Sequence, residues 1–522
     1  MIYKYNPSCI SSFSNMETFL YYSLFTIIIA IAFIIITLIN RTTTLNNNNK
    51  KLPPCPPTLP IIGNLHHLRP RLHRTLQALS QTYGHIFSLW FGSRLVVVVS
   101  CPNLAQQCLT KYDSVLANRP RFLTGKYLFY NHTSLVFSSN NNHWRNLRRI
   151  ATMDVLSTPR LNSFFETRRD EVIRFVRNLV ADTSMGFARV QLRPRITEMS
   201  LNNMMRMVSG KRNEYGEDCR DDNGAGRFRD IIIEILALVD ANNKSDFLPL
   251  LRWFDFDGFV KKLKRVGEEA DVFWQGLLQE HRNEEHGNND TMIQHLLLLQ
   301  KLQPTYYTDH IIKGLIQDML LAGTNTTVLT MEWTLSALLN HPEILKKAKD
   351  EVDNHIGKDR LVDESDIPNL PYLQNIIHET LRLYSPSPLL LPHFSSGEVN
   401  IGGFTIPRDT IVLINSWAMR RDPKIWGDDV ECFKPERFEK EGEANKLMAF
   451  GLGRRACPGY GLANRIMGLT LGLLIQCFEW KRMNDEEIDM REDKGFTFAK
   501  LIPLEAMCEA RPISKKLVKH AI

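Results

Sequence analysis

The stretch Phe450-Gly451-Leu452-Gly453-Arg454-Arg455-Ala456-Cys457-Pro458-Gly459 decides how the rest of this chain is interpreted. It is a glycine-rich loop that places one cysteine, Cys457, just before residues 462–478, an apolar run with helical character. Gly451 and Gly453 permit backbone torsions and close approach, for example against a planar cofactor, that a side chain would forbid. Backbone N–H groups at the start of the following helix would stabilise a thiolate. Cys457 is therefore the candidate metal ligand.

A buried structural cysteine is the alternative for Cys457, because free cysteines usually behave as small hydrophobes. The spacing F-x-x-G-x-R-x-C-x-G favours the ligand, and it resembles the haem-binding signature of the cytochrome P450 family. The resemblance implies haem b as cofactor, Cys457 as its iron ligand, and Phe450, Arg455 and Gly459 as residues of the haem site. It also implies oxygen insertion, because a thiolate ligand favours cleavage of the O–O bond.

Length and composition agree with one large intracellular domain. The chain has 522 residues without a polar linker in its interior. Its net charge of +7 is mild and its basic residues are scattered, which gives no indication of a nucleic-acid partner. The nine cysteines lie far apart and are interpreted as reduced thiols, not as disulfides or a zinc site. The resemblance implies a mainly α fold with small β-sheets, the cytochrome P450 fold, behind an N-terminal transmembrane helix.

The N-terminal region has the composition of a membrane anchor. Residues 19–39 are uncharged, largely apolar and long enough to cross a bilayer core of about 30 Å. Basic residues follow this span, so we expect the bulk of the chain on the cytosolic side of the endoplasmic reticulum membrane. Translation from Met16 instead of Met1 would keep the span. The predicted organisation is an anchor over residues 1–40, a polar linker and proline-rich hinge over 41–60, and a haem-thiolate monooxygenase domain over 61–522.

Further along, residues 86–88 and 95–99 are predicted to form a β-hairpin, and residues 308–340 one long helix with Thr308 as N-cap. Within that helix, residues 322–327 are small or hydroxylated where a buried helix normally carries bulk. One interpretation is a packing notch at Gly323, with the threonines bonded to the preceding turn.

The resemblance implies instead that this patch serves oxygen activation, with Thr326 and Asn325 as catalytic residues. Asn325 departs from the family pattern, which has an aspartate or glutamate at this position. An amide cannot ionise near neutral pH, so the usual proton path is altered here.

Three other residues are candidates for cofactor binding. Trp144 and Arg148 are four residues apart, on one face of a predicted helix. The resemblance implies that this pair binds a haem propionate and that His393 does the same. A half-buried surface tryptophan and a histidine bonded to the backbone are the alternatives.

A charged triad is predicted from two separate motifs. Glu379 and Arg382 are three residues apart in a helix predicted over residues 371–384. The resemblance adds Arg437 and implies a structural triad that serves folding and haem retention, not catalysis.

Shorter stretches, including residues 62–68, 87–92 and 361–366, look like legume isoflavone 2′- or 3′-hydroxylases. This resemblance implies hydroxylation of the B ring of an isoflavone in isoflavonoid phytoalexin biosynthesis. Electrons would come from NADPH through a reductase whose acidic face meets Arg145, Arg149 and Arg454. Three alternatives stay open: the same chemistry on another flavonoid, lignan or phenolic; a haem-thiolate isomerase or dehydratase; and a non-catalytic membrane-anchored protein.

Substrate contacts follow from the family's recognition segments. They fall in residues 122–135 and 389–391, on the long helix at Asp318, and in residues 496–498. An apolar, aromatic-lined pocket suits a small phenolic substrate. The individual candidates are Met319, Ala322, Leu390 and Thr497.

Overall fold

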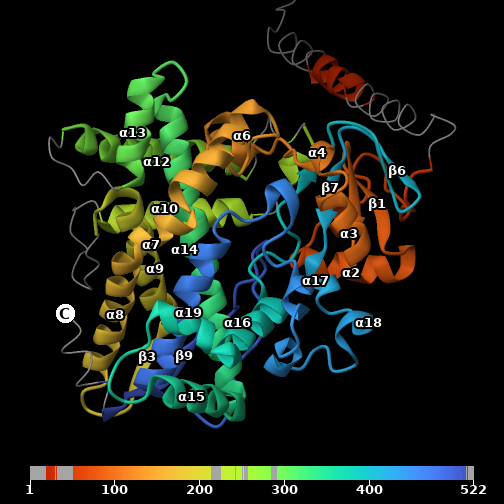
Figure 1. The fold of residues 1–522 in the computed structure, drawn as a ribbon. Helices are drawn as coiled ribbons and strands as arrows, with labels where there is room; N and C mark the ends of the chain where they lie inside the picture. The colour runs from red at the N-terminus through yellow and green to blue at the C-terminus, as the bar shows by residue number, and fades with distance from the viewer. Residues whose placement is uncertain are drawn as a thin grey trace, which may run out of the picture.

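The computed structural model describes residues 19–29, 31, 51–212, 225–241, 243–249, 251, 255, 257–283, 291–512 and 514. In this part of the chain helices dominate, and the strands form three small sheets. Most helices gather on the left of Figure 1, and the largest sheet lies on the right. The prediction of a mainly α fold with small sheets is confirmed.

The largest sheet has the strand order β1 (Ile86–Phe91), β2 (Arg94–Val99), β7 (Ile411–Ile414) and β4 (His393–Phe394). β1 and β2 form an antiparallel hairpin, whereas β2 and β7 are parallel. The predicted hairpin is confirmed, with a first strand that continues to Phe91 because Leu89 to Phe91 are apolar and aromatic residues suited to a strand. The smaller sheets contain β3 (Ala188–Gln191), β9 (Glu505–Ala510) and β8 (Phe478–Lys481), and β5 (Val399–Ile401) with β6 (Phe404–Ile406).

Helix α14 (Asp309–Asn340) is the central element of the helical part. Its 32 residues are buried over most of its length, as expected for an apolar helix surrounded by others. It contacts α9 (Leu192–Ser209), α16 (Pro371–Tyr384) and α19 (Tyr460–Cys477). The predicted helices 308–340, 371–384 and 462–478 are thus confirmed. Thr308 occupies the N-cap position, although its side chain accepts no capping hydrogen bond.

The other helices surround this centre and the sheet (Figure 1). They are α2 (Leu72–Tyr83), α3 (Pro102–Leu109), α4 (Asp113–Leu116), α5 (Leu123–Tyr127), α6 (Asn142–Arg149), α7 (Thr158–Ser163), α8 (Phe165–Asp182), α10 (Ala225–Asp240), α12 (Phe259–Asn283), α13 (Met292–Leu302), α15 (Pro342–Ile356), α17 (Ser416–Met419) and α18 (Pro423–Trp426).

Part of the predicted hinge is attached to the sheet. Ser88 of β1 donates from its backbone N–H to the Pro54 carbonyl (2.8 Å) and from its hydroxyl to the Pro53 carbonyl (2.9 Å). The Asn64 side chain donates to the Pro57 carbonyl at 3.0 Å. The proline-rich half of the predicted linker is therefore fixed to the domain, whereas residues 41–50 lie outside the described residues.

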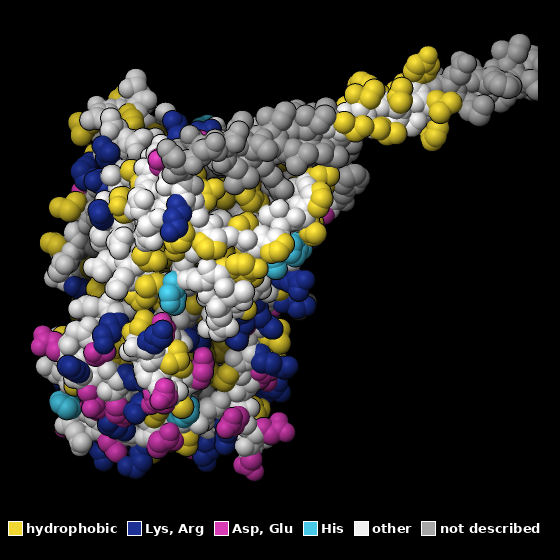
Figure 2. Space-filling model, turned by 90° about the vertical axis from the view of Figure 1, so that its right-hand side faces the viewer, with side chains coloured by type: hydrophobic (Ala, Val, Ile, Leu, Met, Phe, Trp, Pro, Cys, Tyr) yellow, Lys and Arg dark blue, Asp and Glu magenta, His cyan; other side chains and the backbone are white. Residues whose placement is uncertain are grey.

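The predicted anchor is described only in part. Residues 19–29 are helical and largely exposed, whereas residue 30, residues 32–39 and Met16 lie outside the described residues. No helix within the described ranges combines the length and the apolar character needed to cross a membrane. On the face shown in Figure 2, hydrophobic side chains gather in the upper part and charged side chains in the lower part. Leu59 and Ile61, just after the hinge prolines, are among the exposed apolar residues.

Candidate active site around Cys457

The loop before α19 is closed by its own backbone. The Cys457 N–H donates to the Phe450 carbonyl at 2.8 Å, and the Phe450 ring meets Tyr460 edge-on. Gly451 and Gly453 both have φ of 68°, so the predicted need for glycine is confirmed. A Cβ on Gly453 would lie 1.9 Å from the Leu109 carbonyl oxygen. The side of Gly453 where a Cβ would stand therefore meets the end of α3, and the approach of the loop to a planar cofactor stays a prediction.

The Cys457 side chain is accessible, in contrast to the buried thiols of Cys108, Cys477 and Cys508. This difference counts against the structural-cysteine alternative. Protein atoms still surround the sulfur, because burial raises the pKa of the thiol. The Gly459 backbone N–H and the Arg148 guanidinium act in the opposite direction and lower that pKa. The site thus provides an accessible sulfur with two groups that stabilise its thiolate.

Helix α14 is exposed at one place in its middle. Ala322 and Thr326, one turn apart, are exposed, while the residues on either side are mostly buried. The Thr326 hydroxyl donates to the Ala322 carbonyl at 2.8 Å, which leaves its lone pairs as acceptors. Asn325 is half-buried.

Gly323 lies on a different side of α14 from this exposed face, the side that packs against α9. A Cβ there would lie 2.5 Å from the Met204 sulfur of α9, so Gly323 is the packing notch of the first interpretation. The packing interpretation is therefore confirmed for Gly323 and for Thr324, Thr326 and Thr327, whose hydroxyls donate to the preceding turn. Ala322 and Thr326 form an accessible surface, and the role of Thr326 and Asn325 in oxygen activation stays a prediction.

Arg455 is held by three backbone carbonyls and one aromatic ring. It donates to Ala117 (2.9 Å), Leu135 (3.3 Å) and Ser138. Its guanidinium carbon lies 4.1 Å from the centre of the Trp144 ring. Trp144 donates its single N–H to the same Leu135 carbonyl at 3.2 Å. The structure thus brings the helix α6 motif and the cysteine loop together, with Trp144 against Arg455.

A further arginine joins this cluster and was missed from the sequence. Arg119 is buried and donates to the carbonyls of Leu391 (3.1 Å), Pro392 (2.7 Å) and Val136. It lies between two short helices and belongs to no motif, so no pattern in the sequence indicated it.

The electrostatics of Arg119, Arg148 and Arg455 distinguish them from ordinary surface arginines. Burial lowers the pKa of Arg119 to about 10 and, together with repulsion from Arg119 and Arg148, lowers the pKa of Arg455 to about 8. In the described part of the chain, none of the three forms an ion pair with a carboxylate. Buried cations need counter-charges, and the two propionates of haem b would supply them. The residues around Cys457 therefore fit haem b.

His393 lies in β4 beside this cluster but is not one of its cations. It is buried, and its Nδ1 lies 3.1 Å from the Leu116 carbonyl oxygen. Burial and the nearby Arg119 lower its pKa to about 3, so the imidazole is neutral at neutral pH and uses its one N–H on the backbone. The contact of Nδ1 with Leu116 agrees with the backbone-bonded alternative, and binding of His393 to a haem propionate stays a prediction.

The predicted triad forms in the core. Glu379 and Arg382 are both fully buried, and the Arg382 Nε donates to the Glu379 carboxylate at 2.6 Å. The Arg437 Nε lies 3.4 Å from the same carboxylate. Carbonyls of residues 420, 430 and 432 accept the other Arg382 donors. The triad is thus a network in which Glu379 pairs with both arginines, and Arg437 pairs in addition with Asp429 at 2.7 Å.

The substrate candidates lie in different environments. Met319 and Leu390 are buried in hydrophobic clusters, whereas Ala322 is exposed. Asp318 is buried and accepts a hydrogen bond from the Val136 N–H at 3.1 Å. The Thr497 hydroxyl donates to Asp240 at 3.1 Å. Only Ala322 combines a predicted substrate role with exposure on the open face of α14.

The three arginines predicted to meet a reductase, Arg145, Arg149 and Arg454, are all exposed. The Arg454 guanidinium lies 3.6 Å from the Asp113 carboxylate, and Arg149 lies 3.4 Å from Asp154. Exposed pairs of this kind are weak, so these side chains remain accessible to another protein.

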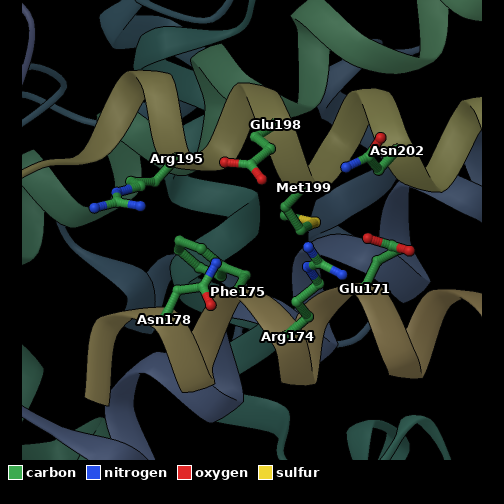
Figure 3. Close-up of a pocket in the computed structure, with 8 residues that line it drawn as sticks. All are labelled: Glu171, Arg174, Phe175, Asn178, Arg195, Glu198, Met199 and Asn202. Atoms are coloured by element: carbon green, nitrogen blue, oxygen red, sulfur yellow. The ribbon is translucent and has the colours of Figure 1, made fainter. Parts of the chain in front are cut away.

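A separate pocket lies between α8 and α9 (Figure 3). Charged groups of both signs project into it from the two helices, and no candidate residue lines it. It is therefore not part of the site around Cys457. Its lining residues are Glu171, Arg174, Phe175, Asn178, Arg195, Glu198, Met199 and Asn202.

Comparison with known proteins gives one family and several relatives. The sequence profile of the family described as Cytochrome P450 matches residues 53–508. The chain is 61% identical to an isoflavone 3′-hydroxylase of Medicago truncatula over 474 residues, which are 90% of this chain and 94% of that protein. It is 60% identical to an isoflavone 2′-hydroxylase of Glycyrrhiza echinata over 471 residues, with the same coverage of 90% and 94%. A (+)-piperitol/(+)-sesamin synthase of Sesamum radiatum is 50% identical over 472 residues, which are 90% of this chain and 92% of that protein.

Proposed function

This chain belongs to the cytochrome P450 family of haem-thiolate monooxygenases, and we propose that it hydroxylates the B ring of an isoflavone at the 2′ or 3′ position. The observation that carries the proposal is the similarity to isoflavone 3′- and 2′-hydroxylases over 90% of the chain. A product of this kind belongs to isoflavonoid phytoalexin biosynthesis.

Haem b supplies the reductive activation of O2, from which one oxygen atom enters the substrate and the other leaves as water. Cys457 would hold the iron through its thiolate, which the Gly459 N–H and Arg148 stabilise. Arg119, Arg148 and Arg455 would pair with the propionates, because they are cations without a carboxylate partner among the described residues. Trp144 would keep Arg455 in place through ring contact.

The protein's own proton chemistry would lie on the open face of α14. The Thr326 hydroxyl would accept a hydrogen bond at Oγ1 from a water molecule, while its own proton, donated to the Ala322 carbonyl, fixes its orientation. Asn325 can orient a water molecule through its amide but cannot give up a proton near neutral pH. Proton delivery would therefore be slower than with an acid at this position.

Electrons would arrive from NADPH through a membrane-bound reductase. The exposed arginines Arg145, Arg149 and Arg454 offer positive charge to an acidic partner. Residues 1–40 would anchor the chain in the endoplasmic reticulum membrane with the catalytic domain on the cytosolic side. Protease added outside sealed microsomes should digest the domain, and protection of the domain would contradict this orientation.

The test of the reaction uses microsomes that contain the full chain and a plant reductase. With NADPH and formononetin or daidzein, we expect oxygen uptake coupled to a monohydroxylated product, whose position is assigned by NMR. Microsomes with Cys457→Ser are the matched control. Oxygen uptake without a hydroxylated isoflavone would reject the proposed substrate but not the family.

A lignan is the second candidate substrate, because a (+)-piperitol/(+)-sesamin synthase is 50% identical to this chain. Offering (+)-piperitol and an isoflavone together in one reaction decides between them. We expect the isoflavone to be consumed first, and preferential consumption of (+)-piperitol would reverse the assignment.

A further inference from the structure

The last residue of α10, Asp240, is bound to a turn far along the chain. The Thr497 N–H donates to one oxygen of the Asp240 carboxylate, and the Thr497 hydroxyl donates to the other at 3.1 Å. The Phe496 N–H donates to the Asp240 backbone carbonyl at 3.3 Å. One residue of α10 thus holds the turn at residues 495–497 with three hydrogen bonds.

Gly495, in the same turn, leaves room for the Asp240 carboxylate because it has no side chain. A Cβ at Gly495 would lie 2.0 Å from a carboxylate oxygen of Asp240, closer than any real contact. Gly495 is not among the glycines with positive φ, so its backbone would accept an alanine. The absence of a side chain at Gly495 therefore serves the contact with Asp240.

Asp240 is poorly placed for the stability of its own helix. A negative charge at the C-terminus of a helix faces the negative end of the helix dipole. Burial also raises the pKa of Asp240, and nearby Asp493 raises it further, whereas the donors of Thr497 and Phe496 lower it. The hydrogen bonds to the turn offset these costs, so the role of Asp240 lies in the turn.

The turn at residues 495–497 is also connected to the elements that are predicted to form the substrate pocket. The Phe498 carbonyl accepts a hydrogen bond from the Trp333 indole of α14 at 2.7 Å, and the Phe498 N–H donates to the Pro386 carbonyl at 3.0 Å. Phe496 packs against the hydrophobic cluster that contains Phe247 and Leu389. The turn is therefore fixed to α14, to the segment before Leu390, and, through Asp240, to α10.

We propose that Asp240 is a positioning residue for the substrate pocket, which sets the aromatic wall of Phe496 through its contacts with Gly495 and Thr497. This inference rests on the proposed function in two respects, that the pocket takes a flat aromatic molecule and that residues 496–498 line it. Asp240 itself does not touch the substrate. Its effect is on how tightly and in which orientation an aromatic ring is held.

The test measures ligand binding to the haem-loaded enzyme by the shift of its visible spectrum. We expect Asp240→Asn to weaken the binding of an isoflavone and of an aryl imidazole by about tenfold, the size of one lost charged hydrogen bond. Unsubstituted imidazole, too small to depend on an aromatic wall, should bind with unchanged affinity. Asp493→Asn is the matched control, because it neutralises a carboxylate on the same turn and keeps the hydrogen bonds of Asp240.

Variants of Gly495 and Asp240, alone and combined, distinguish a positioning effect on ligand binding from a general loss of folded protein. Gly495→Ala should weaken aryl imidazole binding in the wild-type background but not when Asp240 is shortened to serine. Thr497→Val, which removes the hydroxyl donor to Asp240, should show part of the Asp240→Asn effect. If Asp240→Asn yields too little holoenzyme, Thr497→Val carries the same comparison.

Two results would overturn the inference: equal aryl imidazole affinity in Asp240→Asn and wild type, or equal loss for imidazole and aryl imidazole. A wild-type enzyme that binds the aryl imidazole but no isoflavone would instead reject the proposed substrate. The aryl imidazole series would still decide the role of Asp240.

Discussion

Two groups of arginines in this molecule differ in whether a carboxylate of the protein pairs with them. In the triad, Arg382 and Arg437 share the carboxylate of Glu379, and backbone carbonyls accept the remaining donors of Arg382. Around Cys457, Arg119 donates to backbone carbonyls, and Arg455 donates to carbonyls and lies against the Trp144 ring. Neither forms an ion pair with a carboxylate among the described residues. The triad thus contains a counter-charge for its arginines, whereas the cluster around Cys457 leaves positive charge that an anionic ligand can pair.

The pKa shifts express the same contrast. Burial raises the pKa of Glu379, and Arg382 lowers it, so each charge of the triad stabilises the other. For Arg455, burial and repulsion from Arg119 and Arg148 outweigh the opposing effect of Asp113, and its pKa falls to about 8. The triad therefore contributes to the folded state by itself, and the cluster around Cys457 contributes once the propionates are bound.

The largest effect should come from replacing Cys457, the residue that the second group of arginines surrounds. Replacing Cys457 by serine removes the electron-donating thiolate with little change in volume, so monooxygenase activity should vanish. The reduced carbon monoxide complex should lose its red-shifted Soret band. A variant that kept this band would show that another group is the ligand.

Breaking the triad should come next. Glu379→Gln leaves Arg382 buried without its counter-charge, which should destabilise the protein by about 3–5 kcal/mol. We expect a small fraction of the wild-type amount of folded holoprotein, measured by carbon monoxide binding and thermal unfolding. Asp350→Asn is the control, because it breaks an exposed pair with Lys346 at 2.8 Å and should cost at most about 0.5 kcal/mol. Equal losses in both variants would contradict the difference between buried and exposed pairs.

Replacing Arg455 by methionine should separate haem binding from folding. The folded-state pKa of about 8 lies below the ordinary value of 12.5, so the charged side chain costs stability at neutral pH in the haem-free protein. The haem-free variant should therefore be at least as stable as the wild type. Haem should leave it about tenfold faster because one charged contact to a propionate is lost, as measured by transfer to apomyoglobin. If the haem-free variant were less stable than the wild type, Arg455 would stabilise the folded protein by itself, as the triad does.

The smallest effect concerns Asn325, beside the open face of α14. Asn325→Asp adds a group that can ionise next to Thr326, so product formed per NADPH should rise by about twofold and peroxide release should fall. The haem spectrum should not change. Equal coupling in both proteins, with the same reductase and substrate, would mean that the amide already supports the proton path.

Features with a local pattern could be predicted from the sequence. The long helix α14 and the β1–β2 hairpin follow from runs of apolar residues and turn residues. Cys457 and the Glu379–Arg382 pair follow from fixed spacings within one loop or helix.

Features that depend on distant segments could not be predicted. Arg119 reaches the site because residues 391 and 392 pass beside it, and Gly453 is required because Leu109 lies against it. The neutrality of His393 depends on burial, which the residue type does not reveal. Whether Gly323 or Thr326 faces the open side depends on the rotation of α14 against α9.

The carbonyls that hold Arg455 belong to residues 317 to 338 positions earlier in the sequence. During synthesis the segment from Ala117 to Ser138 leaves the ribosome long before Arg455 is made. The carbonyls of this segment therefore lack their arginine donor until the chain is nearly finished. Contacts of such high sequence separation form late in folding, after local helices are in place. Haem capture is therefore a late step of synthesis, and a nascent chain that stops before Arg455 should carry no haem.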